Sequence, residues 1–114
     1  MLMVYIAGPY TLGDVAVNVR TAMEAAHAVM DLGCAPVVPH LSHFLHLHRP
    51  RPYEDWMRAD QALLERCDVL IRLPGPSAGA DAEVRAAMLG GLAVCDGLDV
   101  FAMWLAQRGE GGRS

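Results

Sequence analysis

Residues 67–96, CDVLIRLPGPSAGADAEVRAAMLGGLAVCD, contain two apolar runs separated by a stretch with helical character. The run at 67–74 predicts a strand, and a turn rich in glycine and proline then leads into a predicted helix at about 79–89. Residues 91–96 return to strand character. Two strands joined through a helix are expected to lie parallel in one sheet. This β-α-β unit therefore predicts an α/β fold.

The rest of the chain repeats the same alternation. Further strands are expected at 2–7 and 35–39, and further helices at 53–66, at 98–108 and between an N-cap at Asp14 and a stop signal at Gly33. The segment 40–52 is expected to be loop-like at its end, because Pro50 and Pro52 forbid regular helix there. The prediction is one small doubly wound, Rossmann- or flavodoxin-like α/β domain over 1–108, with a parallel sheet of four to five strands flanked by helices. Residues 109–114 are expected to form a flexible tail.

Composition narrows the class of protein. Of the 114 residues, 54% are hydrophobic and 19% are charged, which suits a single domain with its own core. The net charge of −4, without any cationic run, argues against a nucleic-acid partner. The opening MLMVYIAG lacks a charged leader and is too short to span a membrane, so no membrane partner is expected. Three widely spaced cysteines are typical of buried thiols in a reducing cytoplasm.

Ligands of such sheets bind beyond the carboxyl ends of the strands, which directs attention to the loops after 2–7 and 67–74. Glu83 lies in the first turn of the helix at 79–89, where free amides favour an ionised carboxylate. It is either a nucleophile or only a complement to the helix dipole. Asp60 lies inside the apolar stripe of helix 53–66, which costs free energy unless the carboxylate is paired or faces a polar pocket. It is either a functional group or a structural cap.

Other candidates are less specific. His40, His43, His46 and His48 crowd one segment, but their spacing fits no standard zinc motif, and no metal is expected. His40 is expected to contact substrate or to pack the loop. Tyr5 belongs either to the core or to a pocket floor.

The turn before Glu83 has two possible roles. Gly75 and Gly79 allow a close backbone approach, and with Ser77 they either hold an anion at a helix N-terminus or simply build the turn. Neither a dinucleotide fingerprint nor a P-loop is present, so no cofactor is expected.

Three phrases in register resemble the nucleoside 2-deoxyribosyltransferase superfamily: VYIAGPY, ADQALLERCDVLIRLPG and SAGADAEVRAA. The likeness spans about residues 3–92 and is closest to small bacterial and phage members and to the 2′-deoxynucleoside 5′-monophosphate N-glycosidase. The resemblance implies that Glu83 attacks the anomeric carbon and forms a glycosyl-enzyme. It implies that Asp60 assists departure of the base and that Tyr5 lies near the nucleophile.

The resemblance also implies the substrate contacts. The loop of Gly8, Pro9 and Tyr10 would line the sugar pocket, while Ser77 and the amides around Gly79 would contact phosphate or sugar. The monophosphate glycosidase holds phosphate with an arginine in its first loop, and the loop GPYTLGD here has none. Arg49, Arg51 or a residue of a partner subunit could substitute.

The function expected from these features is hydrolysis or transfer at the N-glycosidic bond of a (deoxy)nucleoside or its 5′-monophosphate. Hydrolysis is favoured because the chain is short. A cytoplasmic homodimer or higher homo-oligomer is expected, with a small-molecule nucleoside or nucleotide as the partner. The alternatives are a nucleotide-binding sensor without turnover and a zinc-dependent hydrolase built on the histidines.

Overall fold

The computed structural model describes the backbone of residues 1–113 and the side chains of residues 1–109. Within that range the chain forms four strands, five α-helices and one short 3-10 helix. In chain order these are β1 (Met3–Ala7), α1 (Val15–Asp31), β2 (Ala35–Val37), the 3-10 helix η1 (Pro39–Leu41), α2 (Ser42–His48), α3 (Tyr53–Leu64), β3 (Val69–Arg72), α4 (Ala78–Leu89), β4 (Ala93–Asp96) and α5 (Leu98–Arg113).

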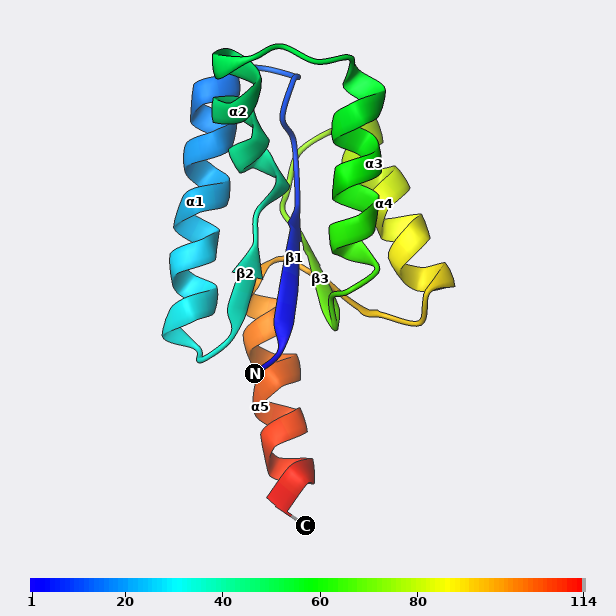
Figure 1. Cartoon of the computed structure of the whole chain (residues 1–114). Helices are drawn as coiled ribbons and strands as arrows, with labels where there is room; N and C mark the ends of the chain where they lie inside the picture. The colour runs from blue at the N-terminus through cyan, green and yellow to red at the C-terminus, as the bar shows by residue number, and fades with distance from the viewer. Residues whose placement is uncertain (114) are drawn as a thin grey trace.

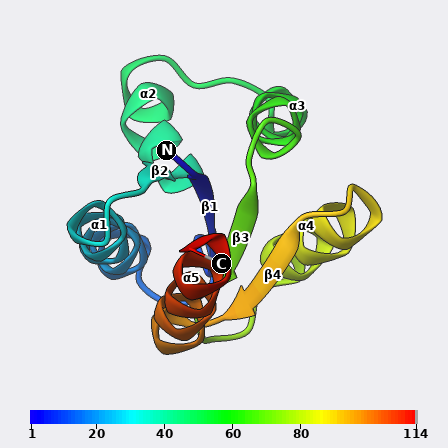
Figure 2. The ribbon, with the colours of Figure 1, turned by 90° about the horizontal axis from the view of Figure 1, so that it is seen from below.

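The strands form one parallel sheet in the order β2-β1-β3-β4, which confirms the predicted doubly wound α/β fold. Figures 1 and 2 show α1 and α5 on one face of the sheet and α3 and α4 on the other. The two central strands, β1 and β3, feed loops that leave the same edge of the sheet. In parallel sheets of this kind, that edge is where ligands bind.

The core has two halves because successive residues of a strand point to opposite faces. Val4 and Ile6 of β1 pack on the side of α1 and α5, together with Phe101. Tyr5 and Ala7 of the same strand pack on the side of α3 and α4. The sheet is therefore buried on both faces, as its continuous apolar strands predict.

Several element ends follow from local chemistry. The Asp14 carboxylate caps α1 by accepting a hydrogen bond from the amide of Val17, 3.2 Å away. Gly33 follows the helix with a φ of +83°, which confirms its predicted role as the stop signal. Residues 39–48 form η1 and α2, for which the sequence pattern gave no clear helical signal. The reason is that α2 is short and contains no buried residue.

The last helix is longer than the predicted 98–108, since α5 continues to Arg113. The flexibility expected at 109–114 stays a prediction, and Ser114 lies outside the described residues. Among the residues that the structure does describe, no helix has the length and apolar character needed to cross a membrane.

Close packing fixes the two loops at the carboxyl edge. A Cβ atom on Gly8 would lie 3.0 Å from the Cβ of Leu73, so the loops after β1 and β3 touch at this glycine. Gly75 has a φ of +112°, and a Cβ there would lie 2.9 Å from Cγ of Pro9. The glycine therefore lets the turn after β3 approach the loop after β1. The close approach that Gly75 allows is to Pro9.

Gly75→Ala is expected to destabilise the protein more than Gly13→Ala. Both residues have positive φ, which costs a non-glycine residue about 1–2 kcal/mol. A Cβ on Gly13 meets nothing within 4 Å, whereas one on Gly75 overlaps Pro9. The overlap adds about 1–3 kcal/mol, measurable as a difference in the free energy of unfolding in urea. Equal losses in the two variants would contradict the packing described here.

Candidate active site

A cleft of about 840 Å³ opens beyond the carboxyl ends of β1 and β3. Its walls come from the loop after β1, the η1–α2 segment, the inner side of α3 and the first two turns of α4. Asp60 lines it from α3 and Glu83 lines it from α4. The two residues therefore come from helices that are neighbours on one face of the sheet (Figure 1).

Glu83 lies in the second turn of α4, not in the first turn as predicted, because the helix begins at Ala78 and Asp81 is its first-turn carboxylate. A residue of the central strand holds Glu83 in place. Tyr5 is 0% exposed, and its hydroxyl donates a hydrogen bond to Oε2 of Glu83. Burial, and after it the carboxylate of Glu83, raise the pKa of the Tyr5 phenol above its ordinary value. Tyr5 therefore remains a neutral hydrogen-bond donor, and it is at once a core residue and the support of Glu83.

Opposing influences act on the Glu83 carboxyl. The pKa of Glu83 is raised, because burial outweighs the hydrogen bond from Tyr5 and the charge of Arg72, which both lower it. A hydrogen bond that the ionised form accepts and a nearby cation stabilise a carboxylate in a partly buried position. Glu83 thus has two groups that favour its negative charge.

The surroundings of Asp60 favour its neutral, protonated form. Burial first, and the charge of Glu83 second, raise the pKa of Asp60 to about 7. Among the side chains that are described, none donates a hydrogen bond or forms an ion pair with it. We therefore assign the negative charge of the pair to Glu83 and a retained proton to Asp60 near neutral pH. Two carboxyl groups with separated protonation states are suited to act as nucleophile and acid.

Arg72 completes this arrangement, although nothing in the sequence pattern marks it as a site residue. It ends β3 and donates hydrogen bonds to the carbonyls of Leu73 and Gly75 and to Oδ1 of Asp81, the latter two at 3.0 Å. Asp81 is not in the cleft lining. Its first-turn carboxylate forms an ion pair with Arg72, which in turn holds the turn after β3.

The loop after β1 contributes Gly8 and Tyr10 to the cleft, whereas Pro9 is not part of the lining. His40 is 5% exposed, and its Nε2 donates to the carbonyls of Gly8, at 3.2 Å, and Pro9, at 3.1 Å. Burial lowers the pKa of His40, which keeps the ring neutral. His40 therefore packs and orients this loop, and it also lines the cleft.

Two further histidines have partners in the wall of the cleft. His43 Nδ1 lies 3.0 Å from the Tyr10 hydroxyl, and His46 Nδ1 accepts a hydrogen bond from Trp56 Nε1 at 2.9 Å. No cluster of three or more potential metal ligands occurs among the described residues. The histidine segment thus forms hydrogen-bonded scaffolding between α2, α3 and the first loop.

Ser77 and Gly79 both line the cleft at the start of α4. Ser77 is the N-cap of α4, and its Oγ accepts a hydrogen bond from the amide of Ala80 at 3.0 Å. The hydroxyl proton of Ser77 is still available to a ligand. A Cβ on Gly79 would lie 3.8 Å from the Tyr53 hydroxyl, so α3 and α4 approach each other here.

Residues 2–96 match the model of a family described as "Domain of unknown function (DUF7768)", and the chain belongs to that family. No curated protein sequence matches it.

The solved structures that share its fold include two deoxyribosyltransferases. One is the 2-deoxyribosyltransferase of Bacillus psychrosaccharolyticus, with a TM-score of 0.61, 16% identity, and coverage of 82% of this chain and 69% of that chain. The other is the 2-desoxiribosyltransferase of Leishmania mexicana, with a TM-score of 0.64 and 17% identity over 83% of this chain. This chain spans only 63% of the Leishmania protein.

Replacing Asp60 with asparagine is expected to stabilise the protein at alkaline pH. The pKa of Asp60 rises from its ordinary 3.8 to about 7 on folding, so the folded state binds a proton that the unfolded chain has released. Stability of the unsubstituted protein should therefore fall between about pH 4 and pH 7. The neutral amide of Asp60→Asn avoids this loss.

Urea unfolding at pH 4 and pH 8 would measure the effect. The gain from Asp60→Asn should be larger at pH 8, while Glu65→Gln, which removes an exposed carboxylate at the end of α3, serves as the control. A gain that is the same at both pH values would show that Asp60 does not retain its proton on folding.

Proposed function

We propose that this protein breaks the N-glycosidic bond of a (deoxy)nucleoside or its 5′-monophosphate through a covalent glycosyl-glutamate intermediate. The observation that carries the proposal is the pair of carboxyl groups in one cleft, with Glu83 supported by Tyr5 and Asp60 biased toward its protonated form. The fold shared with two 2-deoxyribosyltransferases supports the choice of a nucleoside substrate.

In the first step, a Glu83 carboxylate oxygen attacks the anomeric carbon while the bond from that carbon to the base breaks. The bonding electrons leave with the base nitrogen, and Asp60 supplies the proton that neutralises it. The transition state has oxocarbenium character, which the negative charge of Glu83 stabilises. Tyr5 holds one carboxylate oxygen, which leaves the other oriented for attack.

In the second step, the glycosyl ester is released. Asp60, now a carboxylate, takes a proton from water as the water oxygen attacks the anomeric carbon, and the Glu83 carboxylate leaves. A second nucleobase in place of water gives transfer instead of hydrolysis. The same two residues therefore serve both outcomes, and the acceptor that enters the cleft decides between them.

Glu83→Ala is expected to lose base release while keeping ligand binding. Removal of the nucleophile should lower the rate by about 10²–10⁴-fold or more, a range typical of positioned catalytic groups. The assay is chromatography of free base after incubation with each deoxynucleoside and deoxynucleoside monophosphate, with and without a second base. Asp99→Asn, which removes an exposed first-turn carboxylate of α5, should retain full activity.

Release of base by the Glu83→Ala variant at the unsubstituted rate would end the proposed role of Glu83. Binding of substrates without release by the unsubstituted protein would instead indicate a nucleotide sensor. Lanes with a second base separate transfer from hydrolysis, because only transfer yields a new nucleoside.

The pH dependence of kcat/KM should report Asp60. Since the acid form donates the proton, activity is expected to fall as pH rises through about 7, the pKa of Asp60. Asp60→Asn should be about 10²–10⁴-fold slower and should lack this alkaline limb. A pH-rate profile that retains the limb in Asp60→Asn would assign it to another group.

A further inference from the structure

Arg51 occupies a distinctive position at the mouth of the cleft. It lies in the connector between α2 and α3 and lines both the cleft and a smaller hollow of about 430 Å³ against α3. Trp56 is shared by the two spaces as well. Among the described residues, Arg51 is the one arginine in the cleft lining, and Arg49 is not part of it.

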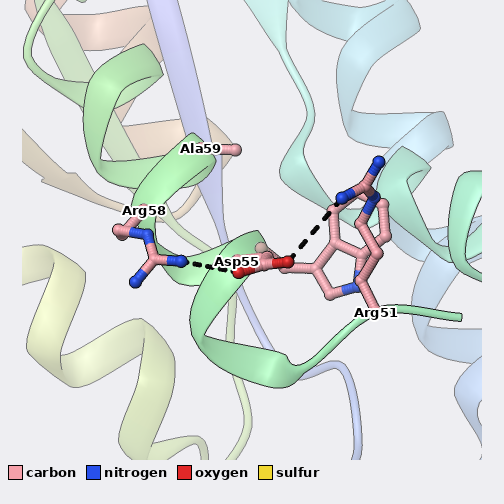
Figure 3. Close-up of a pocket in the computed structure, with 5 residues that line it drawn as sticks. Arg51, Asp55, Arg58 and Ala59 are labelled. Carbon is pink, nitrogen blue, oxygen red and sulfur yellow. Dashed lines mark hydrogen bonds and ion pairs between the residues drawn. The ribbon is translucent and has the colours of Figure 1, made fainter.

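The guanidinium of Arg51 is weakly engaged by the protein. Figure 3 shows Asp55 between two arginines. Arg58 donates a hydrogen bond to Oδ1 of Asp55 at 2.6 Å. The distance from Nη1 of Arg51 to Oδ2 of Asp55 is 3.7 Å, which is too long for a hydrogen bond. One carboxylate faces two guanidinium groups, so the cluster has a residual charge of about +1. In the described part of the chain, no acceptor receives a hydrogen bond from the Arg51 guanidinium.

The backbone of Arg51, in contrast, is fixed. Its amide donates to His46 Nδ1 at 3.3 Å, the same atom that accepts from Trp56 Nε1. Pro50 and Pro52 flank it and restrict the conformations of the connector. The position of the residue is therefore set in advance, while its guanidinium keeps its donors for a ligand. This is the arrangement expected of a preorganised anion contact.

We propose that Arg51 binds a phosphomonoester on the substrate, so that the cleft selects a nucleotide over the corresponding neutral nucleoside. This inference rests on the proposed function for the identity of the rest of the substrate. Guanidinium matches phosphate in geometry and forms paired, charge-assisted hydrogen bonds with it. Arg58 keeps its hydrogen bond to Asp55. Arg51 can therefore bind phosphate without leaving the Asp55 carboxylate unpaired.

The test measures binding, separately from turnover. Calorimetry on the Glu83→Gln variant compares each deoxynucleoside 5′-monophosphate with its deoxynucleoside, and inorganic phosphate serves as a third probe. The monophosphate is expected to bind about 10–100-fold more tightly than the nucleoside, as hydrogen bonds to a charged group predict. Arg51→Gln in the same background should abolish that preference and leave the affinity for nucleoside unchanged.

Arg49→Gln is the matched control, because it removes an arginine of the same connector that lies outside the cleft lining. It should retain the preference for monophosphate. Arg51→Lys, which keeps the charge but not the paired donors, should retain only part of it. This second variant keeps the test decisive if Arg51→Gln does not fold.

Equal affinity for monophosphate and nucleoside, or no measurable binding of monophosphate, would overturn the assignment of Arg51. So would a loss in Arg51→Gln that is the same for both ligands. Failure of the proposed function looks different: the monophosphate still binds through Arg51, but the unsubstituted protein releases no base. Release from both substrate types with equal kcat/KM would retain the proposed function and reject the phosphate contact.

Discussion

The hydrogen bond from Tyr5 to Glu83 is the interaction on which the arrangement of the site depends. It joins the middle of the central strand to the second turn of α4, and burying either group without a partner would cost several kcal/mol. Because side chains alternate along β1, a shift of one residue would point Tyr5 at α1 and bring Ile6 under Glu83. The same residue, Tyr5, therefore links the register of β1 in the sheet to the placement of Glu83.

The sequence predicted the parts of the molecule that obey simple periodicity. Continuous apolar runs revealed the strands, and glycine and proline marked the loops at the carboxyl edge. Asp60 stood out as an acidic residue within an apolar helical stripe, and Glu83 as an acidic residue expected in the first turn of a helix. Tyr5 could be assigned either to the core or to the pocket floor, and the structure shows why: its ring is buried among core residues while its hydroxyl reaches Glu83.

Other features depend on contacts between segments far apart in the chain, which periodicity does not encode. Arg72 appears as an ordinary strand end until α4 brings Asp81 to it. The fit of Gly75 against Pro9 requires both loops to be in place. Helix α2 has seven residues and no buried side chain, so its apolar residues give no consistent stripe. The segment becomes helical through its connection to η1 and its contacts with the first loop and α3.

The histidine segment links these observations to the chemistry of the cleft. A metal centre would need imidazole lone pairs directed at one point, but the Nδ1 lone pair of His46 already accepts from Trp56 and from the amide of Arg51. His40 uses its Nε2 proton on two carbonyls of the first loop. These rings act as rigid spacers between polar groups. His40 orients the loop beside Glu83, and His46 positions Trp56 and Arg51 at the mouth. The segment therefore organises both ends of the proposed substrate site.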